Sequence, residues 1–86
     1  MNIDLKGKRV IVTGASRGIG RAIATAFAND GAKVAICSRN FADIAKVGEA
    51  LAERADAVIA RAVDVTDSHN VRTFVAEVAE AWGGVD

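Results

Sequence analysis

The chain has 86 residues and a mass of 8.9 kDa, and its 11 basic residues balance its 11 acidic ones. This balance argues against binding to nucleic acid or to a membrane surface through bulk charge, and we expect neither partner. No apolar run approaches the length of a membrane-spanning helix.

Short apolar runs alternate along the chain with segments of helical periodicity. Strands are expected at residues 9–13, 33–38 and 57–63, and helices at 18–29, 41–54 and 68–82. This βαβαβα order predicts an α/β fold with a parallel sheet. Right-handed crossovers place the strands in the order 3-2-1, with the first two helices on one face and the third on the other.

Capping residues and apolar faces support these helices. Gly31 is the expected C-cap of the first helix, Asn40 the N-cap of the second, and Thr66 or Asp67 the N-cap of the third. The single cysteine, Cys37, is expected in the core, which favours a reducing compartment. The second helix is expected to bury Phe41, Ile44, Ala45, Gly48, Leu51 and Ala52, and the third Val71, Phe74, Val75, Val78 and Trp82.

A glycine-rich turn, Thr13-Gly14-Ala15-Ser16-Arg17-Gly18-Ile19-Gly20, joins the first strand to the first helix. Gly14 allows a sharp reversal, and Gly18 and Gly20 let backbone N–H groups approach a pyrophosphate at the helix N-terminus. The other interpretation is a tight connection without a ligand. A Walker-type loop is excluded because Ile19 occupies the position of its second glycine, and the spacing does not match Gly-x-Gly-x-x-Gly.

The pattern Thr-Gly-x-x-x-Gly-x-Gly resembles the short-chain dehydrogenase/reductase family in its non-extended branch. The resemblance spans nearly all of the chain and continues at three further segments: Cys37-Ser38-Arg39, Asp64-Val65-Thr66-Asp67 and Trp82-Gly83-Gly84-Val85-Asp86. It implies the N-terminal, cofactor-binding part of a Rossmann-type doubly wound domain, similar to that of 3-oxoacyl-carrier-protein reductases. The fourth strand is expected to be absent, which leaves the first strand as an open edge.

The residues after the second strand favour NADP(H) over NAD(H). An NAD site places an acid about 20 residues beyond the glycines, to bind the ribose 2′-hydroxyl. Ser38 and Arg39 occupy those positions. Arg17 is disfavoured beside a helix N-terminus unless an anion neutralises it. The other interpretation makes both arginines ordinary solvated surface residues.

The resemblance assigns further roles at this site. Ser16 and Ser38 would join the two arginines at the 2′-phosphate, Asp64 would bind the adenine amino group, and the backbone of Val65 would contact the ring. From the residues alone, Asp64 is equally a loop carboxylate or a helix-entry residue. No metal ligands are expected, and His69 is expected at the surface. The expected cofactor-binding residues are Gly14, Ser16, Arg17, Gly18, Ile19, Gly20, Ser38, Arg39, Asp64 and Val65.

Two functions remain open from the sequence. The first is the cofactor-binding half of an oxidoreductase that, when complete, transfers hydride between NADPH and a carbonyl or alcohol. The family's catalytic serine, tyrosine and lysine cannot be mapped here because the chain has no tyrosine, so no catalytic residue is assigned. The second is a non-catalytic dinucleotide-binding or assembly module. On the first interpretation the chain is a piece of a larger cytoplasmic protein, which the resemblance implies is a homo-oligomer, a tetramer or dimer.

Overall fold

A computed structural model describes residues 6–16 and 18–86. Within these residues three strands alternate with three helices: β1 (Arg9–Thr13), α1 (Gly18–Asn29), β2 (Lys33–Ser38), α2 (Phe41–Ala52), β3 (Ala57–Ala62) and α3 (Ser68–Trp82). The predicted elements are confirmed. α2 ends at Ala52 rather than 54, where the chain tightens and the N–H of Arg54 donates to the carbonyl of Leu51, only three residues back. β3 ends at Ala62 rather than 63.

The three strands form one parallel sheet with β2 in the middle. Val34 of β2 lies in register with Val10 of β1 and with Val58 of β3. The order β1-β2-β3 confirms the predicted arrangement. All three strands therefore bring their carboxyl ends to the same edge of the sheet, where a Rossmann-type fold binds its ligand.

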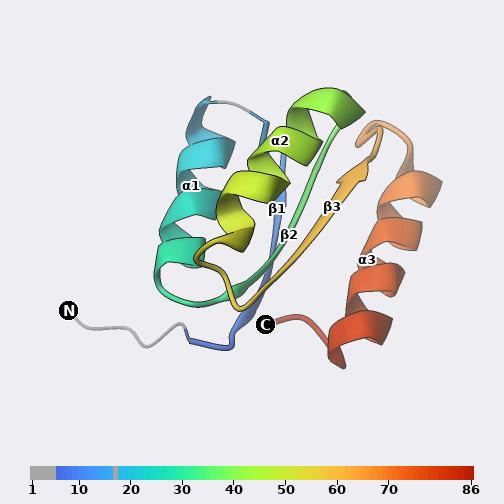
Figure 1. Ribbon diagram of the computed structural model, residues 1–86. Helices are drawn as coiled ribbons and strands as arrows, with labels where there is room; N and C mark the ends of the chain where they lie inside the picture. The colour runs from blue at the N-terminus through green and yellow to red at the C-terminus, as the bar shows by residue number, and fades with distance from the viewer. Residues whose placement is uncertain (1–5, 17) are drawn as a thin grey trace.

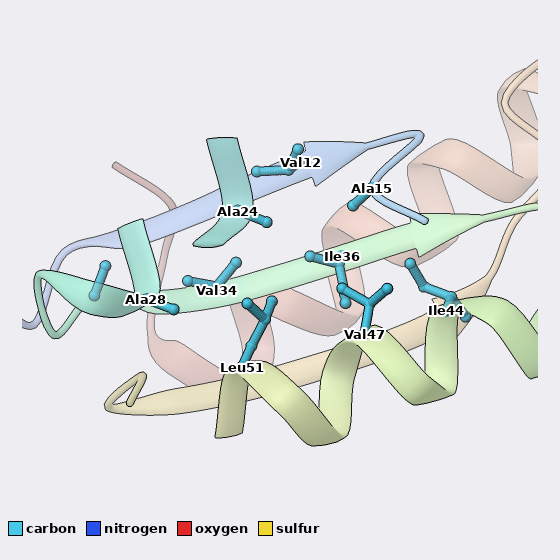
Figure 2. Close-up of a cluster of buried hydrophobic side chains, with 10 residues drawn as sticks. Val12, Ala15, Ala24, Ala28, Val34, Ile36, Ile44, Val47 and Leu51 are labelled. Atoms are coloured by element: carbon cyan, nitrogen blue, oxygen red, sulfur yellow. The ribbon is translucent and has the colours of Figure 1, made fainter. Parts of the chain in front are cut away.

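Helices cover both faces of the sheet, as Figure 1 shows. Val34 and Ile36 of β2 point to the face under α1 and α2, and Ala35 and Cys37 point to the face under α3. This alternation follows from the two-residue period of a strand. Figure 2 shows the larger core cluster, in which Ile36 lies opposite the α2 side chains. The predicted placement of α3 on the opposite face is confirmed.

Caps at the helix ends agree with the sequence. The Asn40 side chain accepts a hydrogen bond from the N–H of Asp43 at 3.1 Å. Asp67 is the N-cap of α3, so of the two candidates Thr66 is not used. Gly31 follows α1 with a φ of 81°, and its N–H donates to the carbonyl of Ala28. Each of these contacts satisfies a backbone group that the helix leaves unpaired.

The predicted apolar faces of α2 and α3 need correction. Phe41 is 63% exposed and Ala52 is also exposed, whereas Val47, which was not predicted, is buried. Phe41 follows the correct helical spacing, but it lies outside the residues that form the core and most of its surface is accessible. On α3, Val75 is 39% exposed, while Phe74 and Val78 are buried.

The edge of β1 is not open along its whole length, contrary to the expectation. The N–H of Asp86 donates to the carbonyl of Arg9 at 2.8 Å. The Asp86 carboxylate accepts from the backbone N–H and the guanidinium of Arg9 at 2.9–3.0 Å. The segment after α3 therefore returns to the sheet beside the start of β1. None of the helices in the described ranges is long and apolar enough to cross a membrane.

Candidate dinucleotide site

The turn between β1 and α1 lies at the carboxyl edge of the sheet. Gly14 and Gly18 both have a φ of 63°, in the left-handed region that glycine adopts without strain. A Cβ at either position would meet nothing within 4 Å, so open space lies beside both residues. Ala15 is buried between them, and its N–H donates to the carbonyl of Cys37 at 3.2 Å. This hydrogen bond ties the turn to β2.

Gly20 serves a different purpose, because it allows α1 to approach the turn closely. A Cβ at Gly20 would collide with the carbonyl of Gly14, lying only 3.0 Å from the carbonyl carbon. The first turn of α1 carries no acidic residue. Its unpaired N–H groups and the positive end of the helix dipole favour an anion at this place.

Ser38 and Arg39 stand at the end of the central strand. Ser38 is buried, and its hydroxyl donates to the carbonyl of Asn40 at 3.2 Å. Its own carbonyl accepts from the N–H of Val63 at 2.8 Å, which joins the ends of β2 and β3. Arg39 is exposed. The strand therefore ends with a fixed hydroxyl followed by an accessible cation.

Cys37 lies directly beneath this region. Burial raises the pKa of the Cys37 thiol, and a backbone hydrogen bond from Gly14 opposes this effect only in part. The thiol is therefore neutral at physiological pH and belongs to the core, as predicted.

Asp64 follows β3, and Thr66 holds its carboxylate. The hydroxyl and the backbone N–H of Thr66 both donate to Oδ1 of Asp64, at 2.6 Å and 3.0 Å. These two hydrogen bonds hold the pKa of Asp64 below its usual range, and the positive charge of Arg39 adds a smaller effect in the same direction. Asp64 is therefore a fixed negative charge near a cation at neutral pH.

A hollow of about 310 Å³ opens between the ends of the three strands. It joins the glycine turn, the end of β2 and the loop after β3. The residues that line it are Gly14, Ser16, Ser38, Arg39, Asn40, Val63 and Val65. The glycine turn and the end of β2 therefore contribute polar groups and a cation, and the segment after β3 contributes two valines. This combination suits the ribose and flat base of a nucleotide.

The structure brings together half of the ten predicted residues in this hollow, namely Gly14, Ser16, Ser38, Arg39 and Val65. Gly18, Ile19 and Gly20 lie outside its lining at the start of α1, and Ile19 is 80% exposed. Asp64 lies between two lining residues without lining the hollow itself. Arg17 lies outside the described residues.

Two residues of the lining were missed by sequence reasoning. Asn40 was interpreted only as a helix cap, and Val63 only as the end of a strand. Val63 directly follows β3, and Asn40 is the second residue after β2. Their position after parallel strands was therefore the signal that could have identified them. No group of potential metal ligands occurs in the described ranges, and His69 is exposed as expected.

Comparison with known proteins identifies a matching family and similar proteins. A family model described as short chain dehydrogenase matches residues 8–86. Sorbitol dehydrogenase from Cereibacter sphaeroides is 42% identical over 82 residues, which cover 95% of this chain and 31% of that protein.

Solved structures share the fold at similar identity. L-sorbose reductase from Gluconobacter frateurii, complexed with NADPH and L-sorbose, has a TM-score of 0.92 and 34% identity over 100% of this chain and 33% of its own. A short chain dehydrogenase/reductase from Burkholderia phymatum in complex with NAD has a TM-score of 0.89 and 30% identity, over 98% of this chain and 30% of its own. The chain thus spans about a third of the length of these proteins.

Proposed function

The chain belongs to the short-chain dehydrogenase family, and from this premise we propose that it binds NADP(H) in the hollow at the ends of its strands. The observation that carries the proposal is the lining of the hollow, which, among the residues that the structure describes, contains Ser16, Ser38 and the cation of Arg39 but no carboxylate. An NAD-type site needs an acid at the end of β2 to bind the ribose 2′-hydroxyl. Ser38 and Arg39 instead offer a hydroxyl and a guanidinium that suit a 2′-phosphate.

The expected orientation of the cofactor follows from the same geometry. The adenosine end occupies the hollow, where Val63 and Val65 offer an apolar surface to the base. The pyrophosphate lies at the start of α1, beside the open space at Gly14 and Gly18. The NADPH complex of L-sorbose reductase supports this choice, whereas the NAD complex of the Burkholderia protein shows that family membership alone does not decide between the cofactors.

We further propose that the chain is the N-terminal, cofactor-binding part of an oxidoreductase that transfers hydride between NADPH and a carbonyl or alcohol. In this proposal the site supplies cofactor binding, and the catalytic tyrosine of the family lies outside these 86 residues, which contain no tyrosine. The whole protein is proposed to be a homo-oligomer. The one cysteine of these 86 residues, Cys37, is a buried free thiol, which supports the proposal of a reducing, cytoplasmic location.

Replacing the arginine tests the cofactor proposal. Arg39→Ala removes charge-assisted hydrogen bonds to the 2′-phosphate, so NADPH binding should weaken about 10- to 100-fold while NADH binding stays nearly unchanged. Fluorescence titration with both cofactors at fixed salt measures the two affinities. Arg72→Ala is the matched control, because Arg72 is an exposed arginine on α3 outside the hollow. Equal losses for NADH and NADPH in Arg39→Ala would contradict the proposal.

A further inference from the structure

Resting on the proposed function, we propose that Asp64 is a specificity-determining residue whose charge opposes Arg39, and that Thr66 holds this carboxylate away from the arginine. Asp64 thereby limits how strongly the hollow prefers a cofactor with a 2′-phosphate. Thr66 keeps Arg39 available to that phosphate.

The first argument is the placement of the two charges around one space. Arg39 lines the hollow from the end of β2, and Asp64 lies between Val63 and Val65, which line it after β3. β2 and β3 are paired neighbours in the sheet. The N–H of Val63 donates to the carbonyl of Ser38 at 2.8 Å, so Asp64 and Arg39 follow two strand ends that lie side by side. Arg39 lines the hollow and Asp64 stands next to that lining, where its charge would act on a phosphate bound by Arg39.

The second argument is that these charges interact without forming an ion pair. Arg39 contributes to the lowered pKa of Asp64, so the carboxylate lies within its field. The ion pairs among the described acids and arginines are Arg9–Asp86 and Arg61–Glu77, and neither involves Arg39 or Asp64. A partner that holds the carboxylate elsewhere would account for the missing ion pair.

Thr66 supplies that restraint. Its hydroxyl and N–H donate to the same oxygen of Asp64, at 2.6 Å and 3.0 Å. Hydrogen bonds to a charged acceptor are stronger than those between neutral groups. The hydroxyl of Thr66 is not needed as the cap of α3, because Asp67 has that role. This hydroxyl is therefore available to hold the carboxylate of Asp64.

The charge of Asp64 should therefore affect the binding of NADPH and of NADH differently. A negative charge beside the hollow disfavours the 2′-phosphate, which NADPH carries and NADH lacks. Any contact between Asp64 and the adenine would affect both cofactors equally, because they share that base. The ratio of the NADPH and NADH affinities therefore isolates the effect of charge.

Two variants should change this ratio in opposite directions. Asp64→Asn keeps the size and the acceptor oxygen but removes the charge, and it should raise the preference for NADPH about two- to five-fold, the range of an exposed charge pair. Thr66→Val removes the hydroxyl and leaves only the backbone N–H as a donor, so the carboxylate is held less firmly, can turn towards Arg39, and the preference should fall. The increase in Asp64→Asn should shrink in high salt, which screens exposed charges.

Controls separate this charge effect from unrelated changes. Thr66→Ser keeps both donors and should leave the ratio unchanged. Asp67→Asn removes an equal charge from a helix cap outside the hollow, and it should also leave the ratio unchanged. The double variant Asp64→Asn/Thr66→Val should behave like Asp64→Asn, because Thr66 acts only through the carboxylate. Urea unfolding of each variant verifies that the fold persists.

Titration of NADPH and NADH against these variants and Arg39→Ala tests the role of Asp64 separately from the NADP(H) proposal. An unchanged or lower ratio in Asp64→Asn overturns the inference, and so does a ratio in Thr66→Val equal to that of the unmodified chain. If Arg39→Ala leaves the ratio unchanged, the NADP(H) proposal itself is wrong. If Arg39→Ala lowers the ratio and Asp64→Asn does not alter it, only the role of Asp64 is refuted.

Discussion

At the scale of single residues, the three glycines of the turn between β1 and α1 meet two different requirements. Gly14 and Gly18 have a positive φ and border open space, where a ligand can approach the backbone. Gly20 has ordinary helical geometry but packs against the carbonyl of Gly14. Substitutions at Gly18 and Gly20 should therefore affect ligand binding and stability differently.

We expect Gly20→Ala to destabilise the fold, because the new Cβ overlaps backbone atoms that cannot move without displacing the turn. Such overpacking costs about 1–3 kcal/mol, measured as the free energy of unfolding in urea. Gly18→Val should instead weaken NADH and NADPH binding alike, because it blocks the pyrophosphate that they share. Unchanged stability in Gly20→Ala would contradict the close packing of α1 on the turn.

A second residue-scale prediction concerns Ser38→Asp. The new carboxylate stands at the end of β2, where it can accept from the ribose hydroxyls of NADH and repels the 2′-phosphate of NADPH. The preference should therefore shift from NADPH towards NADH, as measured by titration of both cofactors. Ser38→Ala serves as the control for the lost hydrogen bond to Asn40. A preference for NADPH that persists in Ser38→Asp would argue against the proposed binding mode.

At the scale of elements, the loop between β3 and α3 divides two tasks between neighbouring residues. Thr66 donates to Asp64 beside the hollow, and Asp67 accepts from the N–H groups of His69 and Asn70 at the start of α3. The sequence allowed either residue as the cap. The structure separates the residue that supports the site from the one that begins the helix.

Asp67→Ala should lower the free energy of unfolding by about 1 kcal/mol, the usual cost of losing an N-cap. Asp67→Asn retains an acceptor oxygen and should be close to neutral. Thermal unfolding followed by circular dichroism gives both values. A loss of similar size in the two variants would indicate that the charge, rather than the cap, stabilises α3.

At the scale of the whole molecule, Arg9 joins the beginning of the sheet to the last residue of the chain. Its guanidinium donates hydrogen bonds to the Asp86 carboxylate at 2.9 Å and 3.0 Å. It also donates to the carbonyl of Trp82 at 3.3 Å. Trp82 packs partly buried against the core beneath α3. The contact therefore holds the segment after α3 against the edge of β1.

We expect Asp86→Asn to lower the melting temperature at neutral pH. Side-chain and backbone hydrogen bonds from Arg9 hold the pKa of Asp86 far below its usual range. A carboxyl whose folded pKa is depressed stabilises the fold above its unfolded pKa of about 4, and this contribution is lost as the pH falls below that value. The difference in melting temperature between the unmodified chain and Asp86→Asn should therefore shrink below about pH 4. A difference independent of pH would contradict this linkage.

Much of the fold follows from local patterns in the sequence. Short apolar runs, helical periodicity and capping residues indicate the order and nearly all bounds of the elements, because each depends on neighbouring residues. Helical spacing did not decide which residues of α2 are buried. Phe41 has the correct spacing for the core, yet its exposure depends on whether another element lies opposite the first turn, and spacing alone does not contain that information.

The sequence by itself determined the class of site. A strand, a glycine turn and a helix start are contiguous, and the physical properties of glycine point to a phosphate group there. Only the tertiary structure decided how the hollow is lined, because Ser16, Arg39 and Val65 belong to three separate loops and meet through the pairing of the strands. It likewise decided the contact of Arg9 with Asp86, which lie 77 residues apart in the chain. Contacts of this kind depend on how elements stack in space, and no local pattern of residues specifies them.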